Sequence, residues 1–354
     1  VSNHHVMAVA SQVLAAGAGF RLLGLSETML KAAAPVVAVC AVRSGAGKSP
    51  TSRAVARWLR DHGHQVAVVR HPMPYGDLNR EAVQRFAGFA DLDLHRCTIE
   101  EREEYEPHLE GGFTVYAGVD YGEILSQVQR DGATVILWDG GNNDLPFFHP
   151  DLLLVVVDPL RAGDELSYHP GQTCLRMADA ILINKIDAAG EAQIAEVTRN
   201  IAAVNPRAPV LRAASPVSVD SPDEVRGKRV LVVEDGPTTT HGGMPTGAGY
   251  AAALRFGAVA VVDPRPWAAG SIADAYRQHP HIGPVLPALG YDEGQRRDLA
   301  ATIAAVPCDL VLSATPIDLR RTIPIEKPLL RVGYEVAIQG RPGLDDILAP
   351  FRHR

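Results

Sequence analysis

A short run of glycines, a lysine and a serine is the part of the sequence that points most directly to chemistry. It lies between an apolar run at 36–42 and a helical stretch at 52–59, and it reads Arg43-Ser44-Gly45-Ala46-Gly47-Lys48-Ser49. Glycines let backbone amides curve around a polyphosphate, while a lysine can reach the terminal phosphates and a serine hydroxyl can bind Mg2+. We therefore expect this loop to bind the phosphates of a nucleotide, with Lys48 catalytic and Ser49 a metal ligand.

The loop departs from the pattern GxxxxGK[ST], because Val42 stands where the first glycine belongs. It resembles instead the variant KGGxGK[ST] of SIMIBI-class P-loop proteins, with Arg43 in the place of the signature lysine. The resemblance implies that Arg43 is a catalytic cation that reaches a nucleotide phosphate, and that the protein is a homodimer. An exposed or helix-capping arginine is the alternative.

Further polar residues follow two other apolar runs. The first of these segments, Val135-Ile-Leu-Trp-Asp139-Gly-Gly-Asn-Asn-Asp144, places a carboxylate where a Walker B group belongs. We expect Asp139 to bind Mg2+ and Asp144 to orient a nucleophile as a catalytic residue, with a turn-forming role the alternative for Asp144. The second segment, Asn184-Lys185-Ile186-Asp187, resembles the guanine-reading NKxD motif of GTPases. It predicts a nucleobase pocket, to which the stretch 213–216 would add a second loop.

Composition limits the class of protein. The chain has 354 residues, 46% of them hydrophobic, and a formal net charge of -7, which argues against a surface built to bind nucleic acid. The cysteines, four in all, are far apart, so neither a disulfide framework nor a zinc site is indicated. Apolar runs are too short to cross a bilayer. We therefore expect a cytoplasmic protein without membrane or nucleic-acid partners.

Short β-branched runs alternate with helical stretches, which predicts an α/β fold with a doubly wound sheet. A P-loop domain is expected at 35–216 and a smaller Rossmann-like domain at 217–354, with the active site in the cleft between them. The residues before them, 1–34, resemble the end of a domain, with a helix near 5–16 and a short strand near 20–23. The strands of the larger domains are expected at 36–42, 66–70, 135–139, 152–157, 181–183, 230–234, 259–262 and 310–313.

An acidic stretch lies between the second and third of these strands, at 91–107. It carries Glu100, Glu101, Glu103, Glu104 and Glu106. A solvated helix face is the expected structure, with metal or partner binding the alternative.

Several long strings together resemble the cyclic 2,3-diphosphoglycerate synthetase family. The resemblance extends from the first residues to about Val336, and the family's N-terminal Rossmann-like region is mostly absent, so 1–34 would be its remnant. It implies that the protein uses ATP and Mg2+ to form an intramolecular phosphoanhydride from 2,3-bisphosphoglycerate, a phosphorylated small molecule. The strings are Pro35-Val-Val-Ala-Val-Cys-Ala-Val-Arg-Ser-Gly-Ala-Gly-Lys-Ser, Val69-Arg-His-Pro-Met-Pro-Tyr-Gly-Asp77-Leu, Ile99-Glu-Glu-Arg-Glu-Glu-Tyr-Glu-Pro107, Trp138-Asp-Gly-Gly-Asn-Asn-Asp144 and Glu234-Asp-Gly-Pro-Thr-Thr-Thr-His-Gly-Gly243.

Such a reaction needs cations and amides around two substrate phosphates. Arg70 and His71 leave a strand at its carboxyl end, where ligands bind in open α/β sheets, and Asp77 is a candidate catalytic base or metal-shell ligand. The remaining candidates for substrate binding lie in the second domain and are Asp235, Thr239, His241, Gly242, Arg265 and Arg320.

The sequence leaves one alternative for the nucleotide and one for the function. The NKxD motif predicts guanine, whereas the resemblance implies ATP, so ATP is the expected nucleotide and GTP is possible. The alternative function is a SIMIBI-class GTPase that acts as a nucleotide-driven switch or metallochaperone-like protein.

Overall fold

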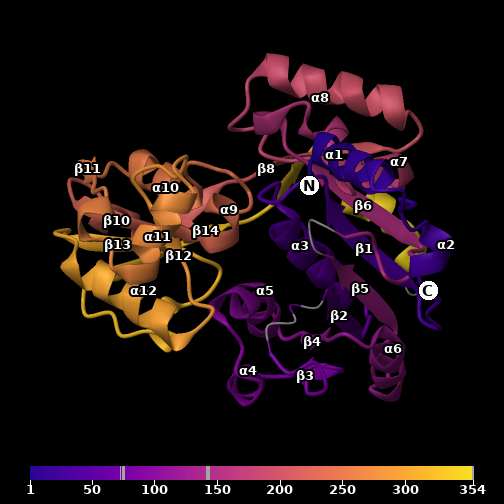
Figure 1. The fold of residues 1–354 in the computed structure, drawn as a ribbon, viewed down its shortest axis with the longest axis horizontal. Coiled ribbons are helices and arrows are strands. Elements are labelled where there is room, and N and C mark those ends of the chain that lie inside the picture. The colour runs from indigo at the N-terminus through magenta and orange to yellow at the C-terminus, as the bar shows by residue number, and fades with distance from the viewer. Residues whose placement is uncertain (72, 74–75, 141–143, 353–354) are drawn as a thin grey trace. The chain divides into compact units, whose positions relative to one another are not determined.

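The computed structural model describes residues 1–71, 73, 76–140 and 144–352 (Figure 1). The chain divides into two compact units. The first comprises Val1–Ala87, Gly111–Ser215 and Val336–Arg354, and the second comprises Gly88–Glu110 and Pro216–Glu335. The expected boundary near 216 coincides with one of these divisions. Elsewhere the division differs from the predicted domains 1–34, 35–216 and 217–354.

Specific contacts explain the differences. The N-terminal segment belongs to the first unit, where Asn3 N donates to Ser167 O at 2.8 Å. The acidic stretch belongs to the second unit because Ile99 is part of that unit's hydrophobic core. The C-terminal segment returns to the first unit because Ile338 pairs with Ala213 in an antiparallel ladder.

The described part of the first unit contains a nine-stranded sheet. Its strands are β1 (Val36–Ala41), β2 (Val66–Arg70), β3 (Gln84–Phe86), β4 (Thr114–Ala117), β5 (Val135–Asp139), β6 (Leu152–Val157), β7 (Ala180–Ile183), β8 (Val210–Ala214) and β15 (Ala337–Gln339). Their order is β15-β8-β7-β6-β1-β5-β2-β4-β3, parallel except at the two edge pairs β15–β8 and β3–β4. Strands β1, β2, β5 and β7 therefore end at the same edge of the sheet.

Helices cover both faces of this sheet, which is why its central strands are continuous apolar runs. Every residue of β1 is buried. One set of its side chains shares a core with α6, α7 and α8, while α3 packs on β1, β2 and β5. The helices of the first unit are α1 (Asn3–Ala15), α2 (Leu25–Thr28), α3 (Lys48–Asp61), α6 (Tyr121–Arg130), α7 (Gly171–Met177), α8 (Glu191–Val204) and α13 (Leu344–Ile347).

The second unit is a smaller α/β unit on a second sheet. Its strands are β9 (Val217–Val219), β10 (Arg229–Asp235), β11 (Ala260–Val261), β12 (Leu286–Ala288), β13 (Leu310–Ala314) and β14 (Leu329–Tyr334). Strand β10 pairs in parallel with β11, β12 and β13, and β14 joins β13 to the antiparallel edge strand β9. The helices are α4 (Phe89–Leu94), α5 (Ile99–Glu110), α9 (Gly236–Thr239), α10 (Ala248–Arg255), α11 (Gly270–Gln278) and α12 (Glu293–Ala305).

The α/β class is confirmed, and the predicted strands at 66–70, 135–139 and 152–157 have the predicted bounds. Two expectations are wrong. The segment 20–23 forms no strand in the described structure, and its Leu22 and Leu23 side chains are exposed. The acidic stretch is not a solvated face, because Glu101, Glu103 and Glu106 of α5 are buried.

Candidate nucleotide-binding site

The phosphate-binding loop connects β1 to α3 at the carboxyl edge of the first sheet. Gly45 and Gly47 have φ angles of 80° and 104°, in the left-handed region that favours glycine. A Cβ atom at Gly47 would lie 2.0 Å from Asn184 Nδ2. The amides at the N-terminus of α3 and the helix dipole favour an anion at this position.

Side chains from two later strand ends hold this loop. Arg161 Nη2 donates to Ser44 O at 2.7 Å, Lys185 Nζ to Gly45 O at 2.6 Å, and Asn184 Nδ2 to Ala46 O at 3.0 Å. The buried Asp158 carboxylate accepts from both Lys185 and Arg161, at 2.8 and 3.1 Å. Three consecutive loop carbonyls are therefore fixed, and Asn184 and Lys185, predicted to bind the nucleobase, position the phosphate loop.

The Asp139 carboxylate lies in a buried network at the end of β5. Its Oδ1 accepts from Lys48 Nζ at 2.6 Å and from Ser52 Oγ at 2.7 Å, and Arg70 Nη1 lies 3.0 Å from Oδ2. Ser49, which follows Lys48 in the first turn of α3, is partly buried. Carboxylate and hydroxyl oxygens suit Mg2+, so Asp139 and Ser49 fit the predicted metal site. Among the described residues, no group of three or more His, Cys, Asp or Glu side chains converges as a metal site.

Arg43 has contacts of its own in the first unit. Its guanidinium forms an ion pair with Asp164, and its Cζ lies 4.5 Å from the centre of the Tyr168 ring. The carboxylate and the aromatic ring fix the orientation of the guanidinium. Arg43 can contact a nucleotide phosphate, as predicted, once that phosphate replaces the Asp164 carboxylate.

The predicted base-reading residue Asp187 lies after β7 on the surface. Its Oδ1 accepts the backbone N–H of Ser215 at 2.9 Å, which brings the NKxD segment and the 213–216 loop together. The carboxylate is exposed. Both segments predicted for the nucleobase thus meet at one place beside the phosphate loop.

The predicted site residues that follow β2 differ in how deeply they are buried. Arg70 is fully buried, and its Nη1 also donates to Asp139 O at 2.7 Å, so it supports the carboxylate predicted to bind metal. His71 is partly buried, while Asp77 is exposed and its Oδ1 accepts from Asn79 N at 3.0 Å. Residues 72, 74 and 75 of the string that begins at Val69 lie outside the described residues.

Asp144 is partly buried and lies close to Tyr121 at the start of α6. Burial, reinforced by the Asp144 charge, raises the pKa of the Tyr121 hydroxyl, which donates to Arg70 O at 3.1 Å. Residues 141–143, which precede Asp144 in the segment 135–144, lie outside the described residues. Asp144 therefore lies near Tyr121, which contacts the end of β2 through Arg70 O.

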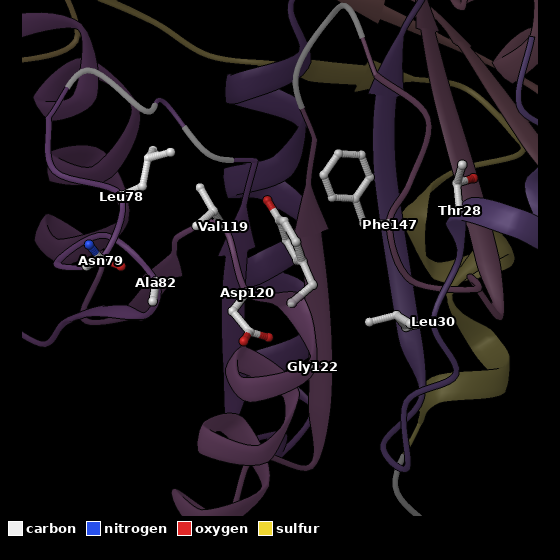
Figure 2. Close-up of a pocket in the computed structure, with 10 residues that line it drawn as sticks. Thr28, Leu30, Leu78, Asn79, Ala82, Val119, Asp120, Gly122 and Phe147 are labelled. Atoms are coloured by element: carbon white, nitrogen blue, oxygen red, sulfur yellow. The ribbon is translucent and has the colours of Figure 1, made fainter.

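A pocket of about 620 Å³ opens beside Tyr121 (Figure 2). Apolar side chains of Leu30 and Phe147 line one part, and Asn79 and Asp120 contribute polar groups. Asp120 also caps α6 by accepting from Glu123 N at 3.0 Å. The residues predicted from sequence do not line this pocket. Its full lining is Thr28, Leu30, Leu78, Asn79, Ala82, Val119, Asp120, Tyr121, Gly122 and Phe147.

In the second unit, the two predicted phosphate-binding arginines already have carboxylate partners. Arg265 Nη1 contacts Asp263 Oδ2 at 2.8 Å, and its guanidinium lies over the Tyr276 ring. Arg320 contacts both Asp318 oxygens, at 2.9 and 2.8 Å. Their charges are balanced locally.

The predicted loop after β10 is compact. Thr239 is buried, and its Oγ1 donates to Gly236 O at 3.1 Å. Gly242 is buried, and a Cβ atom there would lie 2.4 Å from Thr238 O. His241 is exposed. Asp235 ends β10, and its Oδ2 accepts from Thr238 Oγ1 at 3.0 Å.

Several site residues were missed from sequence. Asp158 directly follows the apolar run 152–157. A carboxylate at the end of a predicted strand was therefore the signal that could have identified it as a site residue. Arg161 and Ser52 carry no such signal, because their partners Ser44 and Asp139 lie far away in sequence.

Comparison with known proteins connects this geometry to a family. The CobW/HypB/UreG nucleotide-binding domain matches residues 135–212, which include Asp139 and Asp187. Arginine synthetase ArcE of Thermococcus kodakarensis is 56% identical over 348 residues, covering 98% of this chain and 78% of that protein. The chain belongs to the ArcE family. The 348 residues aligned with that protein extend over both units of the chain.

Solved structures agree with the fold. The Aquifex aeolicus LpxK structure in complex with ATP covers 99% of this chain and 96% of its own, with a TM-score of 0.53 and 13% identity. At this identity the likeness concerns the fold alone. Together with the CobW/HypB/UreG match, it confirms the predicted P-loop fold of the SIMIBI class. Among the described residues, we find no helix of the length and apolar character needed to cross a membrane.

Proposed function

We propose that the chain is a nucleotide-dependent synthetase that forms arginine. The observation that carries the proposal is the 56% identity over 348 residues to a protein named arginine synthetase. The identity extends over the phosphate loop and the second unit, so it concerns both the nucleotide site and the part of the chain where we expect the substrate.

Formation of arginine at its guanidinium carbon requires a nitrogen to replace an oxygen. The precursor with that oxygen is citrulline, which has a ureido group in place of the guanidinium. Attack of the ureido oxygen on the γ-phosphorus forms an O–P bond, breaks the bond to the nucleoside diphosphate and releases a ureido proton. Addition of ammonia to the ureido carbon then expels inorganic phosphate and leaves arginine.

The residues of the first unit suit phosphoryl transfer. Lys48 binds the terminal phosphates, and Arg43 stabilises charge on the transferred group once it exchanges Asp164 for phosphate. Ser49 and Asp139 hold Mg2+, which neutralises phosphate charge when bound. Asp144 orients the attacking group. Homodimer formation remains a prediction.

ATP is the expected nucleotide and GTP the alternative. The contact between Asp187 and Ser215 supports a base pocket at the NKxD segment. A carboxylate can accept from the amino group of either purine, and it accepts a second hydrogen bond from guanine. Activity should therefore be measured with both nucleotides.

Cyclic 2,3-diphosphoglycerate synthesis is the second candidate, favoured by the long strings in the sequence. Its bisphosphate substrate needs cations that are available to it. Arg265 and Arg320 would have to exchange Asp263 and Asp318 for phosphate, as Arg43 must exchange Asp164, and the open acceptor of Asp235 suits a hydrogen-bond donor rather than a phosphate. These contacts favour the arginine reaction. A GTPase switch without a small-molecule substrate is the third possibility.

The test is product formation by the purified protein with Mg2+ and either ATP or GTP. One arm contains citrulline and ammonium, with arginine measured by mass spectrometry. The other contains 2,3-bisphosphoglycerate, with the cyclic anhydride measured by phosphorus NMR. Lys48→Ala is expected to lower the rate by about a hundredfold or more, while the exposed Lys228→Ala serves as the matched control.

The outcomes separate the three functions. Arginine formed only in the presence of nucleotide supports the proposal and identifies the nucleotide. Cyclic anhydride without arginine would replace it by the second candidate. Nucleotide hydrolysis that neither substrate alters would favour the switch.

A further inference from the structure

The acidic helix α5 contains a buried carboxylate whose charge is not compensated by a hydrogen bond. Glu103 is 5% exposed, and neither of its carboxylate oxygens has a hydrogen-bond partner among the described residues. A buried carboxylate in this condition costs free energy and is retained where a ligand can compensate it. Glu103 therefore differs from its neighbour Glu101, which accepts from Thr98 N at 2.7 Å.

A second carboxylate of the same unit lies close to Glu103. Asp235 ends β10, and its Oδ1 is buried without a hydrogen-bond partner in the described structure. Burial, followed by the charge of Asp235, holds the pKa of Glu103 well above its ordinary value. The two carboxylates thus present three open oxygens within one region of the second unit.

Glu234, which precedes Asp235, shows that backbone N–H groups near the end of β10 can donate to both oxygens of a buried carboxylate. Glu234 is 2% exposed, and its two oxygens accept backbone N–H groups of Gly247 at 2.9 Å, Gly249 at 3.1 Å and Tyr250 at 2.8 Å. Those contacts fix the start of α10. Glu234 is structural, whereas Glu103 and Asp235 keep acceptors open.

We propose that Glu103 and Asp235 bind the nitrogen cation of the amino acid that the synthetase uses or makes. The inference rests on the proposed function and names the carboxylates that select its substrate class. A guanidinium offers five N–H donors and an α-ammonium three, and either can satisfy three open oxygens. A bisphosphate would be repelled by the same groups. The shared chemistry is a cationic nitrogen with several donors.

Binding measurements by isothermal titration calorimetry test the proposal. Glu103→Gln and Asp235→Asn keep the side-chain size and remove the charge, while the exposed Glu326→Gln is the matched control. Arginine carries both cations, citrulline only the α-ammonium, and Nα-acetylarginine only the guanidinium. Comparison of the three ligands therefore identifies which cation the carboxylates bind.

We expect each variant to bind arginine about 10- to 100-fold more weakly than the wild type, with nucleotide binding unchanged. Weakening confined to citrulline and arginine assigns the α-ammonium, and weakening confined to Nα-acetylarginine and arginine assigns the guanidinium. If both variants bind all three ligands as the wild type does, the inference is overturned and the proposed function stands. If the wild type binds none of them, the proposed function fails as well.

The unfolding temperature separates this role from a structural one. Removal of an uncompensated buried charge is not expected to lower the stability of the ligand-free protein. Arginine should raise the unfolding temperature of the wild type and Glu326→Gln more than that of Glu103→Gln or Asp235→Asn. Equal increases in all four proteins would contradict the inference.

Discussion

Lys48 Nζ donates a hydrogen bond to Asp139 Oδ1 at 2.6 Å, and the two side chains are only 3% and 0% exposed. Arg70 contacts the other oxygen of the same carboxylate at 3.0 Å. The residue predicted to bind phosphate and the one predicted to bind Mg2+ therefore neutralise each other. A nucleotide phosphate competes with Asp139 for Lys48, and Mg2+ competes with Lys48 for Asp139. Binding of the phosphate therefore frees Asp139 for Mg2+, and binding of Mg2+ frees Lys48 for the phosphate.

Asp139→Asn is expected to lower the free energy of unfolding by about 3 kcal/mol, because it removes the counter-charge of two buried cations. Urea denaturation measures the change. Asp61→Asn, an exposed carboxylate at the end of α3, is the control and should change it by less than about 0.5 kcal/mol. Equal midpoints for the two variants would show that the Lys48–Asp139 pair does not stabilise the fold.

Gly47→Ala is expected to weaken nucleotide binding at least about tenfold, because the new Cβ would displace Asn184 from the phosphate loop. Gly112→Ala is the matched control. Gly112 also has a positive φ, of 78°, but nothing lies within 4 Å of the added Cβ atom. Fluorescent nucleotide titration compares the two variants, and a similar loss of affinity in both would attribute the effect to backbone strain alone.

Much of the fold could be predicted because strands buried on both faces are continuous apolar runs. β2, β5 and β6 are such strands, and the order of polar residues at their ends placed Asp139 near the phosphate loop. The segment 20–23 shows the limit of this signal. A short apolar run that pairs with no other strand has the same composition as one that does, so composition alone does not distinguish the two.

The partners of the site residues could not be predicted. Arg43 was expected to be a phosphate ligand or an exposed arginine, and its pairing with Asp164 depends on how the chain returns 121 residues later. The burial of Glu103 was missed for a different reason. Hydropathy patterns treat a glutamate as solvated, and only the packing of α5 in the second unit reveals that its carboxylate is buried.

Asp187→Ala is expected to weaken the binding of a GTP analogue more than that of an ATP analogue. A carboxylate accepts two hydrogen bonds from the guanine edge and one from the adenine amino group, so the variant loses more for guanine. The expected difference is about tenfold in the ratio of the two dissociation constants. Competition against a fluorescent nucleotide measures it, with the exposed Asp223→Ala as control, and an unchanged ratio would place the base elsewhere.

The stability of the ligand-free protein should depend on pH through Asp235. Burial, followed by the charge of Glu104, raises the pKa of Asp235 from 3.8 to about 7, with a smaller contribution from Glu100. Glu103 faces the same group, and Thr238 opposes the shift by donating to the carboxylate. Between about pH 4 and about pH 7, Asp235 is therefore more often protonated in the folded protein than in the unfolded chain. The contribution of Asp235 to stability is therefore complete below about pH 4 and is lost as the pH rises to about 7.

Asp235→Asn removes this contribution, since an amide does not titrate in that range. The unfolding temperature of the wild type should fall relative to that of Asp235→Asn as the pH is raised from about 5 to about 8. Differential scanning calorimetry at several pH values measures both proteins without ligand. A difference between them that stays constant over this range would mean that Asp235 is ionised throughout, and that its buried oxygen is already compensated in the folded protein.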